Sequence, residues 1–334
     1  MATNAAKGFF LMVICCMCGL LVYQFGHSVM TKSDSRIRQL LDENKHLRSI
    51  IEKHKIVIPA IAKSTPKPTP KPKPTTQSLQ LSTEFQVPNH MHYTWYHPTK
   101  LTWRFHHMIS VLSAQRFNKP EKIFFWYEKY PQGPLWNETL KKVPNIVMKY
   151  RKKVTSVFGR PVNVPEHQSD IVRLDAVMNY GGIYTDLDVV IVKSFDPLRK
   201  YATTMGLETP GGLCNGIIIS KANASFLKIW HQSYKTFNDN QWAYHSVQLP
   251  AQLAAKHPNL IHVEPRSLHR PNWMEREWIY NTGKLYDLSK NYAVHTWFRF
   301  YNKDHTAEDI KKLNTTLGRL YRNAYYGSMD IINT

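Results

Sequence analysis

Two aspartates, Asp186 and Asp188, stand two positions apart in a segment that is otherwise mostly apolar or β-branched. Residues 183–192 predict a strand, and alternate residues of a strand project from the same face. Both carboxylates are therefore expected on one face, with Leu187 directed towards a core. Carboxylate oxygens are preferred ligands of Mg²⁺ and Mn²⁺, and such an ion stabilises negative charge that develops on a leaving phosphate. The spacing predicts a divalent-metal site for a phosphorylated substrate.

The residues before the two aspartates predict the element that positions them. A helix is expected over 170–179, with Ser169 as its N-cap and with Asp170 and Arg173 on one face. The Gly-Gly pair at 181–182 ends this helix, because glycine tolerates the conformation of a C-terminal cap. An isolated Asp-x-Asp triplet is usually a pair of solvated carboxylates. Here a buried strand is predicted directly after it. Unpaired charge beside such a strand is costly in free energy, so the setting indicates that a metal or a basic group pairs with the carboxylates.

Strand-like and helix-like segments alternate from about residue 85 onwards. The strand-like runs are 91–96, 122–127, 183–192, 202–207 and 216–220, and the helix-like segments are 101–117, 170–179 and 225–236. This alternation predicts an α/β sheet domain. Residues 85–334 are expected to form one catalytic domain.

The N-terminal quarter of the chain predicts a membrane anchor and a stem. Residues 8–25 are apolar and uncharged, close to the minimum length that spans a bilayer. No clear cleavage site follows, so an uncleaved signal anchor is favoured over a cleaved signal peptide. Residues 1–7 are then a cytoplasmic tail, and the rest of the chain lies in a lumen.

Residues 26–84 are predicted to be the stem. The apolar spacing within 34–58 includes Asn44 and suits either a short dimeric coiled coil or a single amphipathic helix. A homodimer through the stem is therefore one of two alternatives. Residues 64–76 alternate Pro with Lys, a composition that favours extended polyproline conformations.

The formal net charge of +20 is spread over both parts of the chain. Residues 1–84 hold 12 Lys and Arg against 5 Asp and Glu, which leaves 32 against 19 for the remainder. A basic surface attracts polyanions, so a polyanion-binding surface protein is one rival function. No zinc-finger or RNA-binding motif is present, and nucleic acid is not an expected partner. A basic cleft also suits a diphosphate.

Cysteines and glycosylation motifs also bear on the compartment. Cys214 is the only cysteine beyond residue 18, so no disulfide is expected within 85–334, and a buried thiol is favoured. Three Asn-x-Ser/Thr motifs begin at Asn137, Asn223 and Asn314. All of them follow the predicted anchor, which supports a lumenal domain.

The pattern S-D-x-x-R, seven residues, then G-G-x-Y-x-D-x-D over 169–188 resembles the sugar-binding DXD region of glycosyltransferase family 32. Golgi galactosyl-, N-acetylglucosaminyl- and mannosyltransferases share this region. The resemblance implies a GT-A-type, Rossmann-like nucleotide-sugar-binding domain with a mixed central sheet. It also implies a nucleotide-sugar donor, a Mn²⁺ or Mg²⁺ cofactor and retention of the anomeric configuration.

The resemblance also suggests roles for single residues. Asp170 and Arg173 match the pair that lies against the donor sugar and diphosphate, and Asp188 matches the direct metal ligand. Asp186 matches a donor contact that reaches the metal through water. The implied substrate-binding residues are Trp95, Tyr184, Asn215 and Trp297. Trp95 either stacks on the nucleobase or is an ordinary core aromatic. Glu208 is a weaker candidate for the sugar pocket. His295, in an element similar to the family's late His-x-Trp, is either a metal ligand or a structural histidine.

The sequence thus predicts a type II Golgi membrane glycosyltransferase. It would move a hexose or N-acetylhexosamine from a nucleotide sugar, with UDP-sugars favoured, to a hydroxyl of a glycan or glycolipid. A small-Gly-Pro element common in the family is replaced by Ser246-Val247-Gln248-Leu249-Pro250, so acceptor choice does not transfer. The main alternative is a catalytically inactive glycan-binding protein on a transferase fold.

Overall fold

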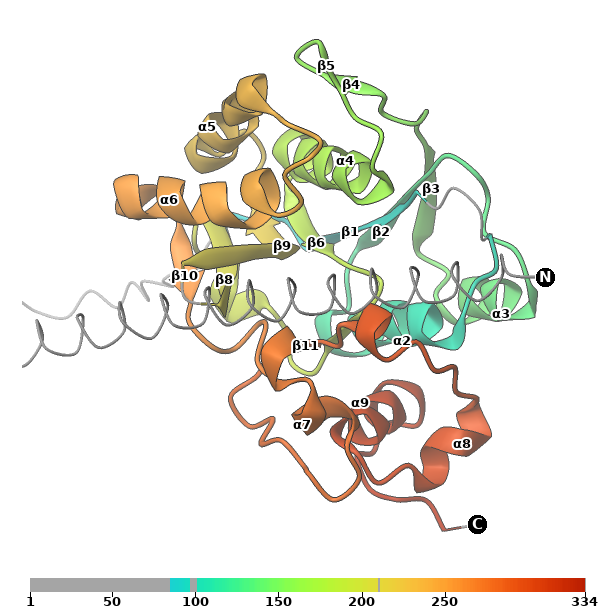
Figure 1. The fold of residues 1–334 in the computed structure, drawn as a ribbon. Coiled ribbons are helices and arrows are strands. Elements are labelled where there is room, and N and C mark those ends of the chain that lie inside the picture. Colours follow the sequence, from blue (N-terminus) through green and yellow to red (C-terminus); the bar gives the residue numbers. More distant parts are fainter. Residues whose placement is uncertain (1–84, 97–100, 210, 334) are drawn as a thin grey trace, which may run out of the picture. The chain divides into compact units, whose positions relative to one another are not determined.

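A seven-stranded mixed sheet forms the centre of the computed structural model, which describes residues 85–96, 101–209 and 211–333. All of these belong to one unit of the chain, Leu79–Thr334. The strand order is β10-β8-β9-β6-β1-β2-β3 (Figure 1). Strand β9 runs antiparallel to β6 and β8, and the other neighbours are parallel. The strands are β1 (His90–Trp95), β2 (Lys122–Tyr127), β3 (Ile146–Tyr150), β6 (Gly182–Thr185), β8 (Thr203–Thr209), β9 (Gly212–Ser220) and β10 (His262–Glu264). The predicted α/β domain with a mixed sheet is confirmed.

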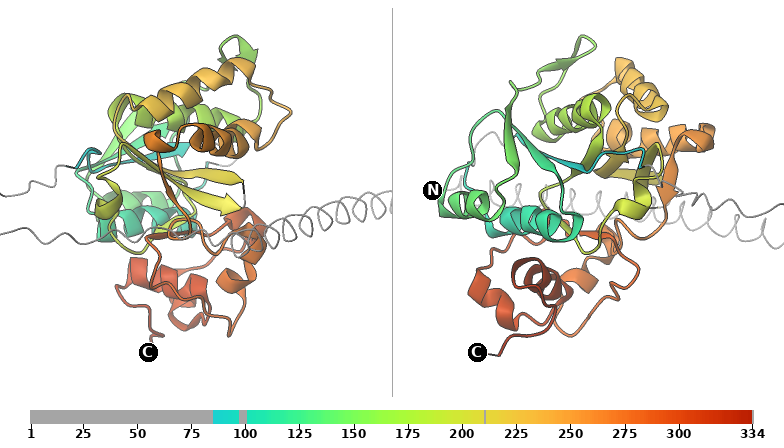
Figure 2. Two further views of the ribbon diagram at one scale, coloured as in Figure 1. Left: turned by 90° about the vertical axis from the view of Figure 1, so that its left-hand side faces the viewer. Right: turned by 180° about the vertical axis from the view of Figure 1, so that it is seen from behind.

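Helices cover both faces of this sheet (Figures 1 and 2). One face carries α4 (Pro165–Tyr180), α5 (Ser225–Ser233) and α6 (Leu249–Lys256), and the other carries α2 (Phe105–Ser113) and α3 (Pro134–Lys142). A C-terminal group packs beyond α2: α7 (Glu277–Tyr280), α8 (Ala307–Lys312) and α9 (Thr316–Tyr325). Two small sheets pair β7 (Val189–Ile191) with β11 (Ala293–His295) and β4 (Ser156–Val157) with β5 (Arg160–Pro161). Short turns of helix are η1 (Ala114–Asn118), η2 (Asp196–Leu198), η3 (Tyr234–Thr236), η4 (Tyr244–Gln248), η5 (Pro258–Leu260), η6 (Trp273–Glu275) and η7 (Phe298–Phe300).

The hydrophobic core lies on both sides of the sheet, because successive strand residues point to opposite faces. In β9, Ile217 and Ile219 join the core cluster that includes α2 and α9 residues, whereas Ile218 joins the cluster beneath α4 and α5. Strands buried on both faces are apolar throughout rather than alternating. This explains why the strands were recognisable as continuous apolar runs.

The predicted strand over 183–192 is wrong as a single element. The structure divides it into β6 and β7, and Asp186 and Asp188 lie in the turn between them. A hydrogen bond of 3.0 Å closes this turn, with the Val189 N–H as donor and the Asp186 carbonyl as acceptor. Strand β7 then leaves the central sheet and pairs with β11. The two carboxylates therefore converge through a turn and not through the period of a strand.

The predicted N-cap at Ser169 is also wrong. Helix α4 begins five residues earlier than predicted, at Pro165, whose fixed backbone angle suits a first helical position. The predicted end of the helix is confirmed at Gly181, which has a φ of +65°. Gly182 has a φ of +114°, and a Cβ there would lie 2.5 Å from the His90 carbonyl oxygen. Glycine is needed at 182 so that β6 can enter the sheet beside β1.

The predicted anchor at 8–25 and stem at 26–84, including 34–58 and 64–76, lie outside the residues that the structure describes. Within 85–96, 101–209 and 211–333, none of the helices combines the length and apolar character needed to cross a bilayer.

Candidate active site

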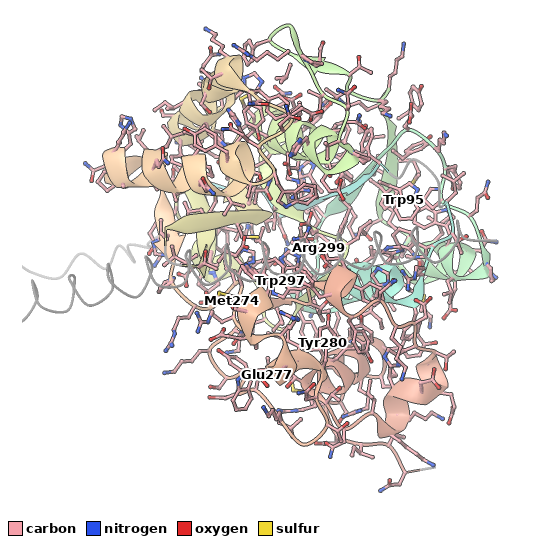
Figure 3. The ribbon with its side chains drawn as sticks, viewed as in Figure 1. Trp95, Met274, Glu277, Tyr280, Trp297 and Arg299 are labelled. Atoms are coloured by element: carbon pink, nitrogen blue, oxygen red, sulfur yellow. The ribbon has the colours of Figure 1, made fainter. Side chains whose placement is uncertain are left out.

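Two adjoining cavities open beside the turn that carries the aspartates. The first, of about 340 Å³, is lined among others by Asp170, Asn215, Glu208, Trp242, Trp273, His295 and Trp297. The second, of about 520 Å³, is lined among others by Thr94, Trp95, His106, Ser169, Tyr184 and Phe298. Five residues line both cavities: Glu166, Arg173, Asp186, Asp188 and Arg299. In Figure 3, Trp297 and Arg299 lie between the sheet layer and the C-terminal helices, and Trp95 lies farther to the right, at the level of the sheet. The two aspartates therefore stand where the cavities meet.

Arg173 joins three of the predicted site residues. Its guanidinium lies 3.1 Å from Asp186 Oδ1 and 3.5 Å from Asp170 Oδ1, and it donates to Asn215 Oδ1 at 3.0 Å. Asn215 in turn donates to Asp170 Oδ1 at 2.7 Å. Burial raises the pKa of Asp170, although Arg173 and Asn215 both act to lower it. A buried arginine requires such partners, because one left without them carries a large desolvation penalty.

Tyr184 lines the second cavity and also supports Asp186, although little of its side chain is exposed. It is 1% exposed, and its hydroxyl donates to Asp186 Oδ1 at 2.5 Å. The Arg173 guanidinium lies over its ring at 4.6 Å. Thr94 Oγ1 lies 3.0 Å from the same hydroxyl and 2.6 Å from Ser169 Oγ. Ser169, inside α4, also accepts from Arg173 at 3.2 Å, so this hydroxyl contributes to the site instead of capping a helix.

Asp188 is paired with His295, which arrives from β11. His295 Nε2 lies 3.0 Å from Asp188 Oδ1, and the Phe298 N–H donates to Asp188 Oδ2 at 3.0 Å. Burial disfavours both charges, but their mutual attraction outweighs it, so the pKa of Asp188 is lowered and that of His295 is raised. Trp297 stacks on His295 with ring centroids 3.7 Å apart. The antiparallel register His295–Val189 brings these distant segments together.

Asp186, Asp188 and His295 fit the divalent ion that the DXD pattern implies. One ligand atom from each residue lies within 4.8 Å of the others. Two carboxylates and one imidazole form a donor set suited to Mn²⁺, and the carboxylates also suit Mg²⁺. These three residues are the ones predicted from the sequence to bind metal.

A bulge in β9 brings Asn215 and Gly216 to the site. Met205 of β8 pairs with Ile218, but the next residue, Gly206, pairs with Cys214, so β9 carries extra residues at this point. Bulges of this kind redirect side chains and are frequent beside active sites. A Cβ on Gly216 would lie 2.9 Å from Asp186 Oδ2 and 3.0 Å from His295 Cε1. Glycine at 216 therefore lets Asp186 and His295 approach the strand.

Trp95 lines the second cavity but is only 4% exposed. Its ring lies against Trp103 at 5.3 Å and edge-on to His107 at 5.1 Å. Stacking of Trp95 on a nucleobase stays a prediction.

Cys214 is a buried free thiol, as expected.

Several residues at the cavities were not predicted from the sequence. His106 stacks on Phe298 at 3.6 Å beside the second cavity, and burial lowers its pKa to about 3. Trp242 is 48% exposed at the first cavity, and Arg299 is exposed where the cavities meet. His106 and Trp242 come from segments without a recognisable motif, whereas Arg299 lies two residues after the His295-Thr296-Trp297 element. Only the pairing of distant elements brings them to the site.

Comparisons with known proteins relate this chain to glycosyltransferases. Residues 104–204 match the family model described as a glycosyltransferase sugar-binding region containing a DXD motif. Glucan organizing enzyme 1 of Cryptococcus neoformans var. grubii is 37% identical over 204 residues, which cover 57% of this chain and 55% of that protein. Inositol phosphoceramide mannosyltransferase 3 of Schizosaccharomyces pombe is 34% identical over 65 residues, which cover 20% of this chain and 18% of that protein. The match therefore spans little more than half of the first relative and far less of the second.

Among solved structures, mouse xyloside xylosyltransferase 1 is similar with a TM-score of 0.41 and 12% identity, over 62% of this chain and 96% of that one. At that score the likeness adds nothing to the architecture described above. The family match confirms the expected resemblance to DXD-containing glycosyltransferases. The mixed central sheet that the resemblance implies is the sheet observed here.

Proposed function

We propose that this chain is a metal-dependent glycosyltransferase that moves a hexose or N-acetylhexosamine from a nucleotide sugar, with UDP-sugars favoured, to a hydroxyl of a glycan or glycolipid. One observation carries the proposal: Arg173, Asp186 and Asp188 stand where two cavities meet. A donor with a nucleoside on one side and a sugar on the other needs its diphosphate at such a junction. The DXD-region match over 104–204 supports the same reaction class.

The two cavities suit the two ends of a donor. The second cavity, with Thr94, Trp95 and Tyr96 at its wall, would take the nucleoside, and the first would take the sugar. Asp170 and Asn215 offer carboxylate and amide groups to sugar hydroxyls at the wall of the first cavity. Arg173 adds positive charge beside the diphosphate.

Asp186, Asp188 and His295 would hold Mn²⁺ or Mg²⁺. When bound, such an ion stabilises the negative charge that builds on the departing diphosphate. Arg173 orients the Asp186 carboxylate, and the Phe298 N–H orients the carboxylate of Asp188. Both oxygens of Asp186 are held: Tyr184 donates to Oδ1 at 2.5 Å, and Arg173 donates to Oδ2 at 3.3 Å.

The transfer step is proposed to proceed with retention. The acceptor oxygen bonds to the anomeric carbon on the face from which the phosphate oxygen leaves. The departing phosphate oxygen takes the acceptor's proton, so atoms and charge balance without a dedicated base from the protein. NMR assignment of the product's anomeric configuration tests this part, and an inverted product would contradict it.

We also propose a type II Golgi membrane location, with 8–25 as the anchor, 26–84 as the stem and the catalytic domain in the lumen. The apolar run at 8–25 and the Pro/Lys-rich stretch at 64–76 support it. A glycolipid acceptor is in keeping with the one relative named as an inositol phosphoceramide mannosyltransferase.

The decisive experiment compares Asp188→Asn with wild type in turnover of a panel of UDP- and GDP-sugars with Mn²⁺. The variant should lose at least about 100-fold in turnover, because a ligand for the charge-stabilising ion is gone. Excess chelator should abolish wild-type activity. Asp196→Asn is the matched control, since Asp196 pairs with Arg199 away from both cavities.

Unchanged turnover in Asp188→Asn, or full activity in excess chelator, would contradict the proposed metal-dependent transfer. Glycan binding without hydrolysis or transfer of any nucleotide sugar would favour the inactive glycan-binding alternative. A thermal-shift series with the same donors shows whether a nucleotide sugar binds at all.

A further inference from the structure

A second group of metal-binding side chains lies next to the carboxylate site: Cys214, His269 and His295. One ligand atom from each lies within 4.8 Å of the others, and all three residues are buried. They come from three separate segments, namely β9, the loop that follows β10, and β11. Neither Cys214 nor His269 has a part in the proposed transfer reaction.

His269 is the observation that points to a ligand. Its side chain is 0% exposed, and neither ring nitrogen has a hydrogen-bond partner among residues 85–96, 101–209 and 211–333. Buried polar atoms are rarely left unpaired, and one that is indicates a bound water or ion. Burial also holds the pKa of His269 well below its usual value, so the ring is neutral, the form that binds metals.

The neighbouring strands leave space for these imidazoles. A Cβ on Gly206 would lie 2.5 Å from His269 Cδ2, and Gly206 pairs with Cys214 across β8 and β9. Gly216 likewise leaves space for His295, because a Cβ on Gly216 would lie 3.0–3.1 Å from two atoms of that ring. Two glycines on adjacent strands therefore accommodate the two histidines.

The spacing and chemistry of the group favour a softer ion than Mn²⁺. Cys214 Sγ lies 3.8 Å from His295 Nδ1. A tetrahedral Zn²⁺ ion with ordinary Zn–S and Zn–N bonds places sulfur and nitrogen about 3.6 Å apart. One thiolate and two imidazoles form a donor set typical of Zn²⁺, whereas carboxylates suit Mn²⁺ and Mg²⁺.

We propose that Cys214, His269 and His295 form a second metal site, selective for Zn²⁺ or a similar soft ion, that shares His295 with the carboxylate site. Binding removes the proton of the Cys214 thiol, which leaves through the adjoining first cavity to solvent. Three protein ligands leave a fourth position for water on the cavity side.

The shared histidine makes the two sites antagonistic. With Nδ1 of His295 on zinc, its Nε2 carries the ring proton and donates to Asp188 Oδ1, 3.0 Å away. A metal-bound histidine commonly donates its other N–H to a carboxylate in this way. His295 is then no longer a ligand for an ion at Asp186 and Asp188. This antagonism rests on the proposed function, whereas the zinc site itself does not.

The test uses Co²⁺ as a spectroscopic substitute for Zn²⁺ in the full chain with Cys15, Cys16 and Cys18 changed to Ser. That background leaves Cys214 as the one cysteine of the chain. We expect a near-ultraviolet thiolate-to-cobalt band and the visible bands of a four-coordinate ion, both displaced by one equivalent of Zn²⁺. Absence of these bands in a folded protein overturns the proposal.

Variants assign the ligands. Cys214→Ser should lose the thiolate band, and His269→Gln should weaken Co²⁺ binding by about tenfold or more. His245→Gln is the matched control, because His245 is also buried with an unpartnered Nδ1 within the described ranges but lies outside the group. Equal Co²⁺ affinity in His269→Gln and His245→Gln would exclude His269 as a ligand and overturn the site.

The antagonism is tested by the EPR signal of free Mn²⁺. Because Zn²⁺ can also displace Mn²⁺ directly from the carboxylate site, one equivalent of Zn²⁺ should release more bound Mn²⁺ from the wild-type chain than from His269→Gln. Zinc binding that leaves Mn²⁺ affinity unchanged overturns the shared role of His295. A chain that gives the cobalt bands but binds no Mn²⁺ supports the soft-metal site and contradicts the proposed function, so the two failures are distinguishable.

Discussion

Arg173 is the residue on which the arrangement of the site depends most. It is 6% exposed and lies within 3.5 Å of both Asp170 and Asp186. Removal of one partner from a buried charged group leaves the others uncompensated, which is far more damaging than the loss of an exposed pair. Arg151, which directly follows β3, offers a comparison, because it pairs with Asp175 of α4 but is itself partly exposed.

At the residue scale we therefore predict that Arg173→Met lowers the free energy of unfolding by about 3–5 kcal/mol. Arg151→Met should cost about 1 kcal/mol or less, because solvent screens the pair. Urea unfolding of both variants measures the difference. Equal losses in the two variants would contradict the view that the Arg173 contacts are specially stabilising.

At the scale of elements, the bulge in β9 positions part of the site. Strand β9 lies inside the sheet, between β8 and β6. The extra residues in β9 place Gly216 against Asp186 and His295, so a side chain at this position collides with both. The same strand contains Gly212, where an added methyl would instead meet Val247 Cγ1 at 2.8 Å. A valine side chain can shift, whereas the Asp186 carboxylate is held by Arg173 and Tyr184.

We predict that Gly216→Ala abolishes the protection against heat that Mn²⁺ and a UDP-sugar give, while the variant still folds. The added Cβ displaces Asp186 or His295 from the metal-binding arrangement. Gly212→Ala should keep most of the protection. Differential scanning fluorimetry with and without ligands checks both variants, and full protection of Gly216→Ala would refute the argument.

His92 ties three elements together inside the protein. Its Nε2–H donates to the Gly181 carbonyl at the end of α4, at 2.8 Å, and its Nδ1 accepts from Trp126 of β2 at 3.2 Å. Burial, only partly offset by the Gly181 contact, lowers its pKa to about 4. The unfolded value is about 6.5, so the folded state prefers the neutral ring. Stability from this preference is complete above pH 6.5 and is lost as the pH falls towards 4.

The predicted outcome is a loss of about 2 kcal/mol of unfolding free energy from this histidine between pH 7 and pH 5. His92→Gln should be less stable at pH 7 but should lose about 2 kcal/mol less than wild type over that interval. His257→Gln is the control, because His257 is exposed. Identical pH dependence in wild type and His92→Gln would disprove the assignment.

At the scale of the whole molecule, the glycosylation motifs bear on the cellular compartment of the catalytic domain. The asparagines of all three glycosylation motifs, Asn137, Asn223 and Asn314, are exposed. A glycan at any of them would extend into solvent, even though Thr139 of the first motif and Thr316 of the third are buried. The lumenal location stays a proposal, and the exposed asparagines give a way to test it.

We predict that the full chain, expressed in secretory cells, resists alkaline extraction from membranes and loses mass on treatment with an N-glycosidase. Deletion of 1–25 should remove the membrane association, and replacement of the three asparagines by Gln should abolish the mass change. An unglycosylated chain in the soluble fraction would contradict the proposed type II topology.

The sequence predicted much of the framework that surrounds the site. The strands β1 and β2, the helix end at Gly181 and the proximity of Asp170, Arg173 and Asp186 agree with the structure. Two predictions were wrong. The strand predicted over 183–192 is divided at the aspartates, and the helix predicted over 170–179 begins earlier. Both concern positions where contacts to distant segments, such as β11, outweigh local propensity.

The sequence by itself determined which residues share an element, because helix and strand periods and glycine punctuation act over a few neighbouring positions. That was enough to place a helix, a Gly-Gly turn and two aspartates in one unit. Only the tertiary structure decided that His295 faces Asp188, that β9 bulges at Gly216, and that His269 is buried beside Cys214. These contacts depend on strand register and loop paths between residues far apart in the chain, which no local pattern encodes.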